Sequence, residues 1–389
     1  MRLILGLLDR HIFKNVFVSC VMAVGFFTFV VTTANALRDL LTPFLAGRLS
    51  GISALKLLLL LTPYAVTYAL PMGVLCGVLL VLGRMSAESE VTAMRAAGLS
   101  LTRIARPIYI LAALGSLLAL AINLEYMPRS RTLYQQELLN AVRTDPMKLL
   151  VPRTFIRDFS RMVVYVGARE GDVLKDVWLW QLDREQRVIR FVKADSGVIN
   201  YDDETNELIF TPPSSVIENR DPKAPENFRT ELVTATTESF QFRFPLDRLL
   251  GKKAGRNKPE WLPFAALQRE IARLSEPAGE GEDVAARGQR LLKLRMVVQD
   301  KFAMALAVLT FALVAVPLGI KVARRETSAN LGIAVALALS YYFLNVAVKW
   351  LDNPKLGPEL LLWVPFLLWV PNAIFLGLGL ALTARVQRA

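Results

Sequence analysis

The chain has 389 residues, 53% of them hydrophobic, and a formal net charge of +12. Its mean hydropathy of +0.38 excludes an ordinary soluble protein of this length, because the apolar residues are concentrated in long blocks. Many basic residues flank these blocks instead of forming one patch, which argues against nucleic acid as a partner. Cys20 and Cys76 lie in separate apolar blocks, so no disulfide framework is expected.

The apolar blocks are long enough to cross a membrane. A bilayer core about 30 Å thick is crossed by roughly 20 apolar residues in a helix. Six segments meet this requirement, at approximately 15–37, 55–83, 104–124, 302–320, 329–349 and 360–383. The sequence therefore predicts a polytopic α-helical membrane protein with six transmembrane helices and one large inserted domain. The expected domains are 1–124 with helices 1–3, 125–300 with the inserted domain and a helical return, and 301–389 with helices 4–6.

Lysine and arginine residues in the short loops predict the orientation of these helices, because the cytoplasmic side carries the excess. One side of the predicted topology has twelve, which are Arg2, Arg10, Lys14, Arg84, Arg95, Arg103, Arg106, Lys321, Arg324, Arg325, Arg385 and Arg388. The other side has five, which are Arg38, Arg48, Lys56, Lys349 and Lys355. Both termini are therefore expected in the cytoplasm, and the inserted domain is expected to be extracytoplasmic.

The first apolar segment is followed by Ala34-Asn35-Ala36, which has the small-residue form of a signal-peptidase site. Two observations favour a retained helix instead. The apolar run is longer than the hydrophobic region of a usual signal peptide, and charged residues such as Asp9 and Lys14 precede it. We therefore expect residues 15–37 to remain as the first transmembrane helix.

The loop between the second and third segments, MSAESEVTAMRAAGLS (85–100), is too long for a simple turn. Ser86 is a favoured N-cap residue for a helix that begins there. Glu88 and Glu90 would lie in the first turn, where the helix dipole favours negative charge. The sequence therefore predicts a short cytoplasmic helix over residues 86–97.

The end of this helix and its two faces can also be read from the sequence. Gly98 can end the helix in the left-handed conformation, and Ser100 can cap the helix that follows. Helical spacing puts on one apolar stripe the residues Ala87, Val91, Met94 and Gly98. A polar face beside it is formed by Glu88, Thr92 and Arg95.

Two interpretations of this amphipathic helix remain open. It could rest on the membrane surface, which is the usual position of such a helix. It could instead dock into a basic groove of a cytoplasmic protein. The acidic first turn, with Glu88 and Glu90, would be repelled by anionic lipid headgroups and fits the second interpretation better.

The inserted domain, residues 125–300, has a β-rich pattern. FQFRF (240–244) alternates apolar and polar side chains. Further short strand candidates are RMVVYV, DVWLWQL, RVIRFVKA, GVINY and ELIFT, separated by turn signals. Strands at intervals of about ten residues favour a sandwich or jellyroll. From about Trp261 to Arg295 the pattern becomes helical, interrupted by the acidic stretch EPAGEGED.

The sequence contains no recognisable catalytic constellation. It lacks GxxxxGK[ST], HExxH and GxSxG motifs, and its one histidine, His11, leaves metal chemistry without ligands. GKKAGRNK (251–258) has glycine and lysine without the spacing of a phosphate-binding loop, and we interpret it as a solvated basic link. We therefore expect no catalytic residue, no metal site and no enzymatic activity.

Residues 70–100, LPMGVLCGVLLVLGRMSAESEVTAMRAAGLS, resemble the corresponding segment of the LptF/LptG permeases. These permeases belong to the ABC exporter that extracts lipopolysaccharide from the inner membrane of Gram-negative bacteria. LLDRHIFKNVF (7–17) and VPLGIKVARRE (316–326) are similar to family segments as well. The three-plus-three layout around an extracytoplasmic β-jellyroll also agrees with the family.

The resemblance implies a fold, a site and a set of partners. It implies that this chain pairs with a second LptF/LptG-type permease and with a dimer of a cytoplasmic ABC ATPase, which uses ATP while the chain binds no cofactor. It implies that the 86–97 helix is the coupling helix, with the family's functional glutamate at Glu90 and with Val91 and Met94 packing beside it. It further implies a periplasmic β-jellyroll that passes lipopolysaccharide to a β-jellyroll bridge protein. Glu88 and Arg95 complete the expected ATPase-coupling set.

The family also uses basic residues near the outer end of the first helix against lipopolysaccharide phosphates. Here Arg38 and Arg48 are the candidates, although Arg38 could also be an interfacial anchor. Three alternatives to lipopolysaccharide export remain. They are an ABC-linked subunit that transmits force, a subunit exporting another lipid or lipoprotein, and a membrane enzyme that modifies lipids. The sequence leaves open whether the chain is of the F type or the G type.

Overall fold

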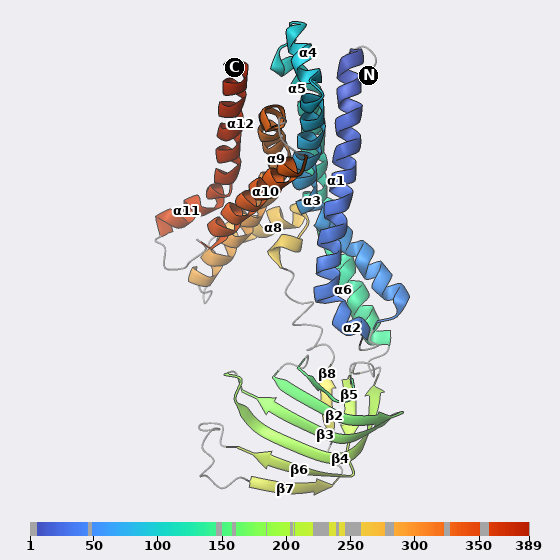
Figure 1. The fold of residues 1–389 in the computed structure, drawn as a ribbon. Coiled ribbons are helices and arrows are strands. Elements are labelled where there is room, and N and C mark those ends of the chain that lie inside the picture. The colour runs from blue at the N-terminus through green and yellow to red at the C-terminus, as the bar shows by residue number, and fades with distance from the viewer. Residues whose placement is uncertain are drawn as a thin grey trace. The chain divides into compact units, whose positions relative to one another are not determined.

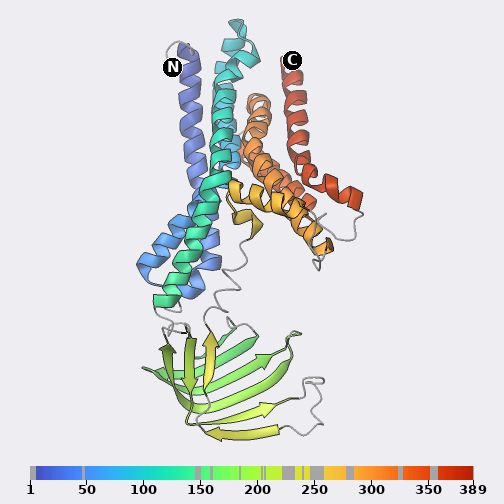
Figure 2. The same ribbon diagram turned by 180° about the vertical axis from the view of Figure 1, so that it is seen from behind.

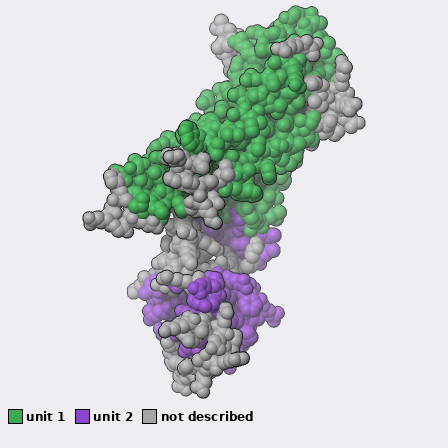
Figure 3. Space-filling model, turned by 90° about the vertical axis from the view of Figure 1, so that its left-hand side faces the viewer, with its two compact units in different colours: residues 1–38, 58–134, 258–389 green, residues 39–57, 135–257 purple. Residues whose placement is uncertain are grey.

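The computed structural model describes residues 6–45, 49–144, 150–157, 161–183, 185–202, 205, 207–220, 233–238, 241–245, 258–276, 284–322, 327–350 and 358–388. The chain divides into two compact units. Unit 1 comprises Met1–Arg38, Leu58–Tyr134 and Lys258–Ala389, and unit 2 comprises Asp39–Leu57 and Gln135–Asn257 (Figure 3).

The helices of the chain include six that are long and apolar enough to cross a membrane, within the described residues. The long helices are α1 (Leu7–Asp39), α3 (Gly51–Ala87), α5 (Leu101–Ala121), α9 (Val284–Val322), α10 (Thr327–Lys349) and α12 (Val370–Arg388). The shorter ones are α2 (Leu41–Leu45), α4 (Glu90–Ala96), α6 (Met127–Thr144), η3 (Pro259–Trp261), α8 (Phe264–Ser275) and α11 (Pro358–Leu367). The six transmembrane helices expected from the sequence are confirmed.

Two of these helices form the centre of unit 1. In α3, 78% of the apolar window is buried within the chain, and in α9 the share is 72%, whereas it is only 22% in α1 and in α10. The outer helices therefore leave most of their apolar surface for lipid or for another protein. Figure 1 shows α4, the start of α1 and the end of α12 at the same end of this unit.

The packing of α1 against α3 depends on two glycines one helical turn apart. A Cβ atom at Gly73 would lie 2.6 Å from the backbone nitrogen of Val24, and one at Gly77 would lie 2.7 Å from Cα of Cys20. Backbone atoms cannot yield as a flexible side chain can. The GxxxG spacing therefore allows the close approach that packs helices together in a membrane.

Two of the expected membrane-crossing segments lie within longer helical runs. After the third segment, α5 continues through a π-helix, η1 (Ile122–Tyr126), into α6. The fourth segment lies within α9, which begins at Val284 in the expected helical return. The change to polar composition marked the expected boundaries, but polar residues such as those of α6 are good helix formers and extend the helix.

Unit 2 contains an antiparallel sheet inserted in the chain between α6 and η3. Its strands are β1 (Thr154–Ile156), β2 (Met162–Glu170), β3 (Val173–Leu182), β4 (Val188–Asp202), β5 (Glu207–Thr211), β6 (Ser214–Asn219), β7 (Val233–Glu238) and β8 (Phe242–Pro245). The pairing order is β1-β2-β3-β4-β5-β8, and β6 pairs with β4 and β7. The expected β-rich insertion is confirmed.

The long strand β4 divides the sheet into two branches. Its residues 190–193 pair with β6, and its residues 198–202 pair with β5. Gly197 lies where the branches separate, and a Cβ atom there would lie 2.6 Å from Cζ of Phe210. The expected alternation in 240–244 is present in the described part, because Phe244 is buried while Gln241 and Arg243 are exposed.

Candidate functional site

The candidate site is α4 and the two turns that connect it to the membrane helices. Its C-terminal end is a complete Schellman motif. Gly98 has a left-handed φ of 86°, its N–H donates to the carbonyl of Arg95 at 2.9 Å, and the Leu99 N–H donates to the carbonyl of Met94 at 3.1 Å. Ser100 Oγ then accepts from the Arg103 N–H at 3.3 Å as the N-cap of α5. The expected functions of Gly98 and Ser100 are thus confirmed.

The start of α4 differs from the expectation. The helix does not begin at Ser86, because α3 continues to Ala87 and α4 begins only at Glu90. Ser89 separates them with a left-handed φ of 61°. Glu88 therefore lies in the connecting turn and not in the first turn of α4. Ser86 Oγ donates instead to the carbonyl of Ile320 at 3.0 Å, near the C-terminal end of α9, where helical carbonyls lack intrahelical partners.

The apolar side of α4 packs against its own chain. Val91 is only 2% exposed, and Met94 and Leu99 are half-buried against the same hydrophobic core as α3 and α9. Val91 and Met94 were expected to pack beside Glu90 in the ATPase-coupling set, and their contact with an ATPase stays a prediction. Within this chain, Val91 fixes α4 to the membrane helices. Ala87 and Gly98 were expected on the apolar stripe and are instead exposed.

The other side of α4 offers polar groups. Glu88, Thr92 and Arg95 are exposed, and Glu90 is half-buried. Within the described residues, the Glu90 carboxylate forms no ion pair. A carboxylate of this kind on an anchored helix can accept a charge-assisted hydrogen bond from a basic group of another molecule. The described residues contain no group of three potential His, Cys, Asp or Glu ligands for a metal ion.

Comparison with known proteins supplies the context for this geometry. The family profile described as "Lipopolysaccharide export system permease LptF/LptG" matches residues 10–385. The chain belongs to the LptF/LptG family. The lipopolysaccharide export system permease proteins LptF of Escherichia coli K12 and of Shigella flexneri are each 29% identical to it over 180 residues. That match covers 45% of this chain and 49% of each relative, so the chain spans about half the length of the curated relatives it matches.

Membership in the LptF/LptG family indicates a multi-pass transport subunit rather than an enzyme. Two cations, Arg38 and Arg48, were expected at the outer end of the first helix. Arg38 is exposed, and its Nη2 donates to Oδ1 of Asn35 at 3.0 Å. Arg48 lies outside the described residues. The expectation that both bind headgroups stays a prediction.

A buried polar pair in this LptF/LptG-family chain was not among the residues expected from the sequence. Lys301 is 6% exposed and Asn123, in the π-helix η1, is 2% exposed. Lys301 Nζ donates to the carbonyl of Asn123 at 2.7 Å and to that of Glu260 at 3.2 Å, and Asn123 Nδ2 donates back to the carbonyl of Lys301 at 3.3 Å. A lysine at the edge of an apolar segment is typical of an interfacial anchor, so this pairing has no recognisable sequence pattern.

A second cation, Arg131, is also buried near the π-helix. Its guanidinium lies 4.2 Å from the ring centroid of Tyr64, 5.7 Å from that of Trp261 and 5.8 Å from that of Tyr134. Such cation–π contacts are stronger away from water. A cavity of about 150 Å³ nearby is lined by Asn123, Lys301, Trp261 and Tyr64, among others. The end of α5 opposite to α4 therefore lies beside a cluster of buried polar side chains.

Proposed function

We propose that this chain is a permease subunit of the ABC transporter that extracts lipopolysaccharide from the bacterial inner membrane. The observation that carries this proposal is the family match over residues 10–385, which overlaps each of the six apolar helices and includes the inserted sheet. In this proposal the chain pairs with a second LptF/LptG-type permease, and lipopolysaccharide enters the apolar space between the two.

The proposed orientation has both termini and α4 in the cytoplasm and the sheet in the periplasm. The distribution of basic residues supports it. The geometry of unit 1 supports it as well, because two opposite views show the start of α1, the end of α12 and α4 at one end (Figure 1, Figure 2). An even number of membrane crossings returns the chain to the side from which it started.

The proposed coupling element is α4, which would bind the cytoplasmic ATPase through its polar side. Glu90 would accept a charge-assisted hydrogen bond from a basic groove residue, with Arg95 and Glu88 at the edge of the contact. Val91, Met94 and Leu99 fix α4 to the core that contains α3 and α9. Closure of the ATPase dimer would therefore move the membrane helices with α4.

The energy for transport would come from ATP bound by the partner and not by this chain. Movement of the helices would reduce the space between the two permeases and expel the lipid toward the periplasm. The antiparallel sheet of unit 2 would then pass the lipid to a bridge protein with a similar β-jellyroll. Arg38 and Arg48 remain the proposed contacts for the phosphates of the headgroup.

The coupling proposal is tested by co-purification of the ATPase with a tagged chain. Glu90→Ala should lower the amount of bound ATPase about tenfold or more, because it removes a charged partner of a hydrogen bond. Glu88→Ala is the matched control, since it removes an exposed carboxylate from the adjacent turn, and it should have the smaller effect. A Glu90→Ala chain that keeps full ATPase binding and transport would reject Glu90 as the coupling residue.

The substrate proposal is tested with the reconstituted complex in proteoliposomes. ATP should drive release of lipopolysaccharide to a soluble β-jellyroll acceptor, and the Glu90→Ala complex should not support this release. Turnover of ATP without any lipid release would favour a subunit that only transmits force. Release of a phospholipid or lipoprotein in place of lipopolysaccharide would favour another export system.

A further inference from the structure

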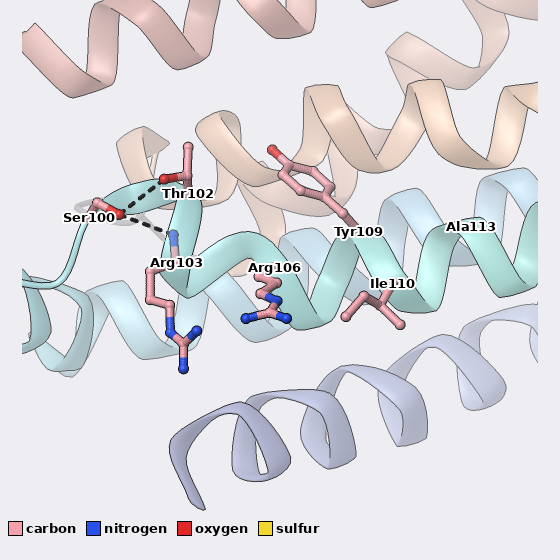
Figure 4. Close-up of a pocket in the computed structure, with 7 residues that line it drawn as sticks. All are labelled: Ser100, Thr102, Arg103, Arg106, Tyr109, Ile110 and Ala113. Carbon is pink, nitrogen blue, oxygen red and sulfur yellow. Dashed lines mark hydrogen bonds between the residues drawn. The ribbon is translucent and has the colours of Figure 1, made fainter. Parts of the chain in front are cut away.

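The N-terminal half of α5 carries a cavity that the coupling function does not use. Its volume is about 680 Å³, and it is lined by Ser100, Thr102, Arg103, Arg106, Tyr109, Ile110 and Ala113. In Figure 4, Arg103, Arg106 and Ile110 project toward α1, and Tyr109 points to the other side of α5. The lining changes along the helix, from hydroxyl and guanidinium groups at its start to apolar groups further on.

The two arginines of this cavity differ in how they are neutralised. Arg103 Nη2 donates to Oδ2 of Asp9 at 3.1 Å, and this carboxylate is 3% exposed. Arg106 is exposed and forms no ion pair with any described residue. The cavity therefore holds one arginine with an internal counter-charge and one whose positive charge is available to a ligand.

The apolar part of the cavity continues along an exposed surface of α5. Beyond Ile110 and Ala113 lie Leu114, Leu117 and Leu118, which are 55%, 64% and 55% exposed. From Arg106 to Leu117 the helix rises about 16 Å at 1.5 Å per residue, and half of a bilayer core is about 15 Å thick. The positive charge of Arg106 therefore lies about the thickness of one leaflet away from Leu117, which is at the far end of this apolar surface.

We propose that this cavity binds an anionic glycerophospholipid, with its phosphate at Arg106 and one acyl chain along Ile110, Ala113 and the exposed leucines. Basic pockets beside transmembrane helices bind anionic headgroups in this way. Arg103, held by Asp9, flanks the phosphate, and Ser100 and Thr102, whose hydroxyl groups are 3.0 Å apart and hydrogen-bonded to each other, line the same cavity. In the proposed orientation this lipid belongs to the cytoplasmic leaflet, next to α4, and only this assignment of the leaflet rests on the proposed function.

The test uses the purified full chain in detergent, titrated with dioleoyl phosphatidylglycerol or dioleoyl phosphatidylcholine and observed by native mass spectrometry. The parent should prefer the anionic lipid. Arg106→Gln should weaken that binding about fivefold, the effect of one cation at a membrane surface. Arg84→Gln is the matched control, because Arg84 is an exposed arginine at the end of α3 outside the cavity, and it should leave binding within about twofold of the parent.

A second variant tests the cavity without changing charge. Ala113→Phe should fill the apolar part and weaken binding of phosphatidylglycerol. Leu339→Phe, at an exposed leucine of α10 outside the cavity and outside the proposed acyl-chain surface, should not. Equal effects of Arg106→Gln and Arg84→Gln, or no preference for the anionic lipid, would overturn the proposal. Binding of lipid A that depends on Arg106, with phosphatidylglycerol unaffected, would also overturn it.

The lipid-binding measurement can be interpreted whether or not the proposed transport function is correct. Lipid binding is measured without ATPase. A failure of Glu90→Ala to disrupt coupling would therefore not affect the lipid-binding result. Arg106→Gln should keep normal co-purification of the ATPase. If it lost the ATPase and retained phosphatidylglycerol, Arg106 would belong to the protein contact, and the lipid proposal would be wrong.

Discussion

The two ends of the helix α5 are held in different ways. At its start, near α4, the fixing groups are a serine cap, the Gly98 turn and the Asp9–Arg103 ion pair, whose arginine side chain is 45% exposed. At its other end, the π-helix places Asn123 against Lys301, and both are more than nine-tenths buried. At the first end, water can reach the arginine of the ion pair, although the Asp9 carboxylate is 3% exposed, and at the second end it can reach neither partner.

The two ends of α5 therefore differ in how much free energy is lost when a polar contact breaks. A polar contact that is solvated contributes little when it is made and costs little when it is lost. A buried one costs its full desolvation penalty when a partner is removed. The α4 end is thus suited to transient binding, and the π-helix end is suited to holding α5, α9 and η3 together. π-bulges often occur at functional sites, and here the bulge widens the helix beside a lysine.

Removing the lysine at the buried end should have the largest effect. Lys301→Met leaves the carbonyls of Asn123 and Glu260 without their ammonium donor, and we expect a loss of about 3 kcal/mol in the free energy of unfolding. This free energy is measured by unfolding the purified chain in mixtures of SDS and a mild detergent. Lys349→Met is the control, because its ammonium, 2.9 Å from Asp300, is on a side chain that is 40% exposed. Equal losses in the two variants would contradict the proposed difference between the ends.

Removing the ion pair at the α4 end should have a smaller effect. Asp9→Ala deletes the acceptor of the Gly6 N–H and of Arg103, but water can solvate the released arginine. We expect a loss of about 1.5 kcal/mol by the same measurement. A loss as large as that of Lys301→Met would show that this end is fixed as firmly as the other.

The Gly98 turn should contribute less again. Gly98→Ala places a Cβ atom at a φ of 86°, which costs about 1 kcal/mol for a residue other than glycine. Gly288→Ala is the control, since Gly288 is an exposed glycine within α9 that has open space around it. That substitution should stabilise the chain by about 0.5 kcal/mol. If both substitutions had the same sign, backbone conformation would not explain the Gly98 turn.

The smallest effect is expected at Asp183, in a half-buried polar turn after β3, and it should depend on pH. Hydrogen bonds from the Arg187 backbone lower the pKa of Asp183 below its ordinary value. A lowered pKa in the folded state means that stabilisation is present above the ordinary pKa and is lost as the pH falls through the lowered one. Asp183→Asn should therefore be slightly less stable than the parent at neutral pH and equal to it in acid. Tryptophan fluorescence during denaturation measures the difference, and a difference that grew in acid would contradict the assignment.

Much of the fold was predictable because it depends on local rules. The length of an apolar run decides whether a helix can cross a bilayer, so six runs predicted six helices. Alternation in the FQFRF segment predicted a strand, and Gly98 and Ser100 predicted the end of one helix and the start of the next. Glu90 was identified through similarity to a family, and its position on the polar side of α4 agrees with a docking role that remains to be tested.

The number of membrane helices, the inserted sheet and the turn that ends α4 therefore follow from the amino-acid sequence. The continuation of α3 to Ala87 depends instead on the packed fold, because Ser86 bonds to the carbonyl of Ile320 in α9, which is 234 residues away in the chain. The anchoring of α4 by Val91 and the pairing of Lys301 with Asn123 depend on the packed fold as well. These outcomes depend on contacts between distant segments, which local propensity and hydropathy do not encode.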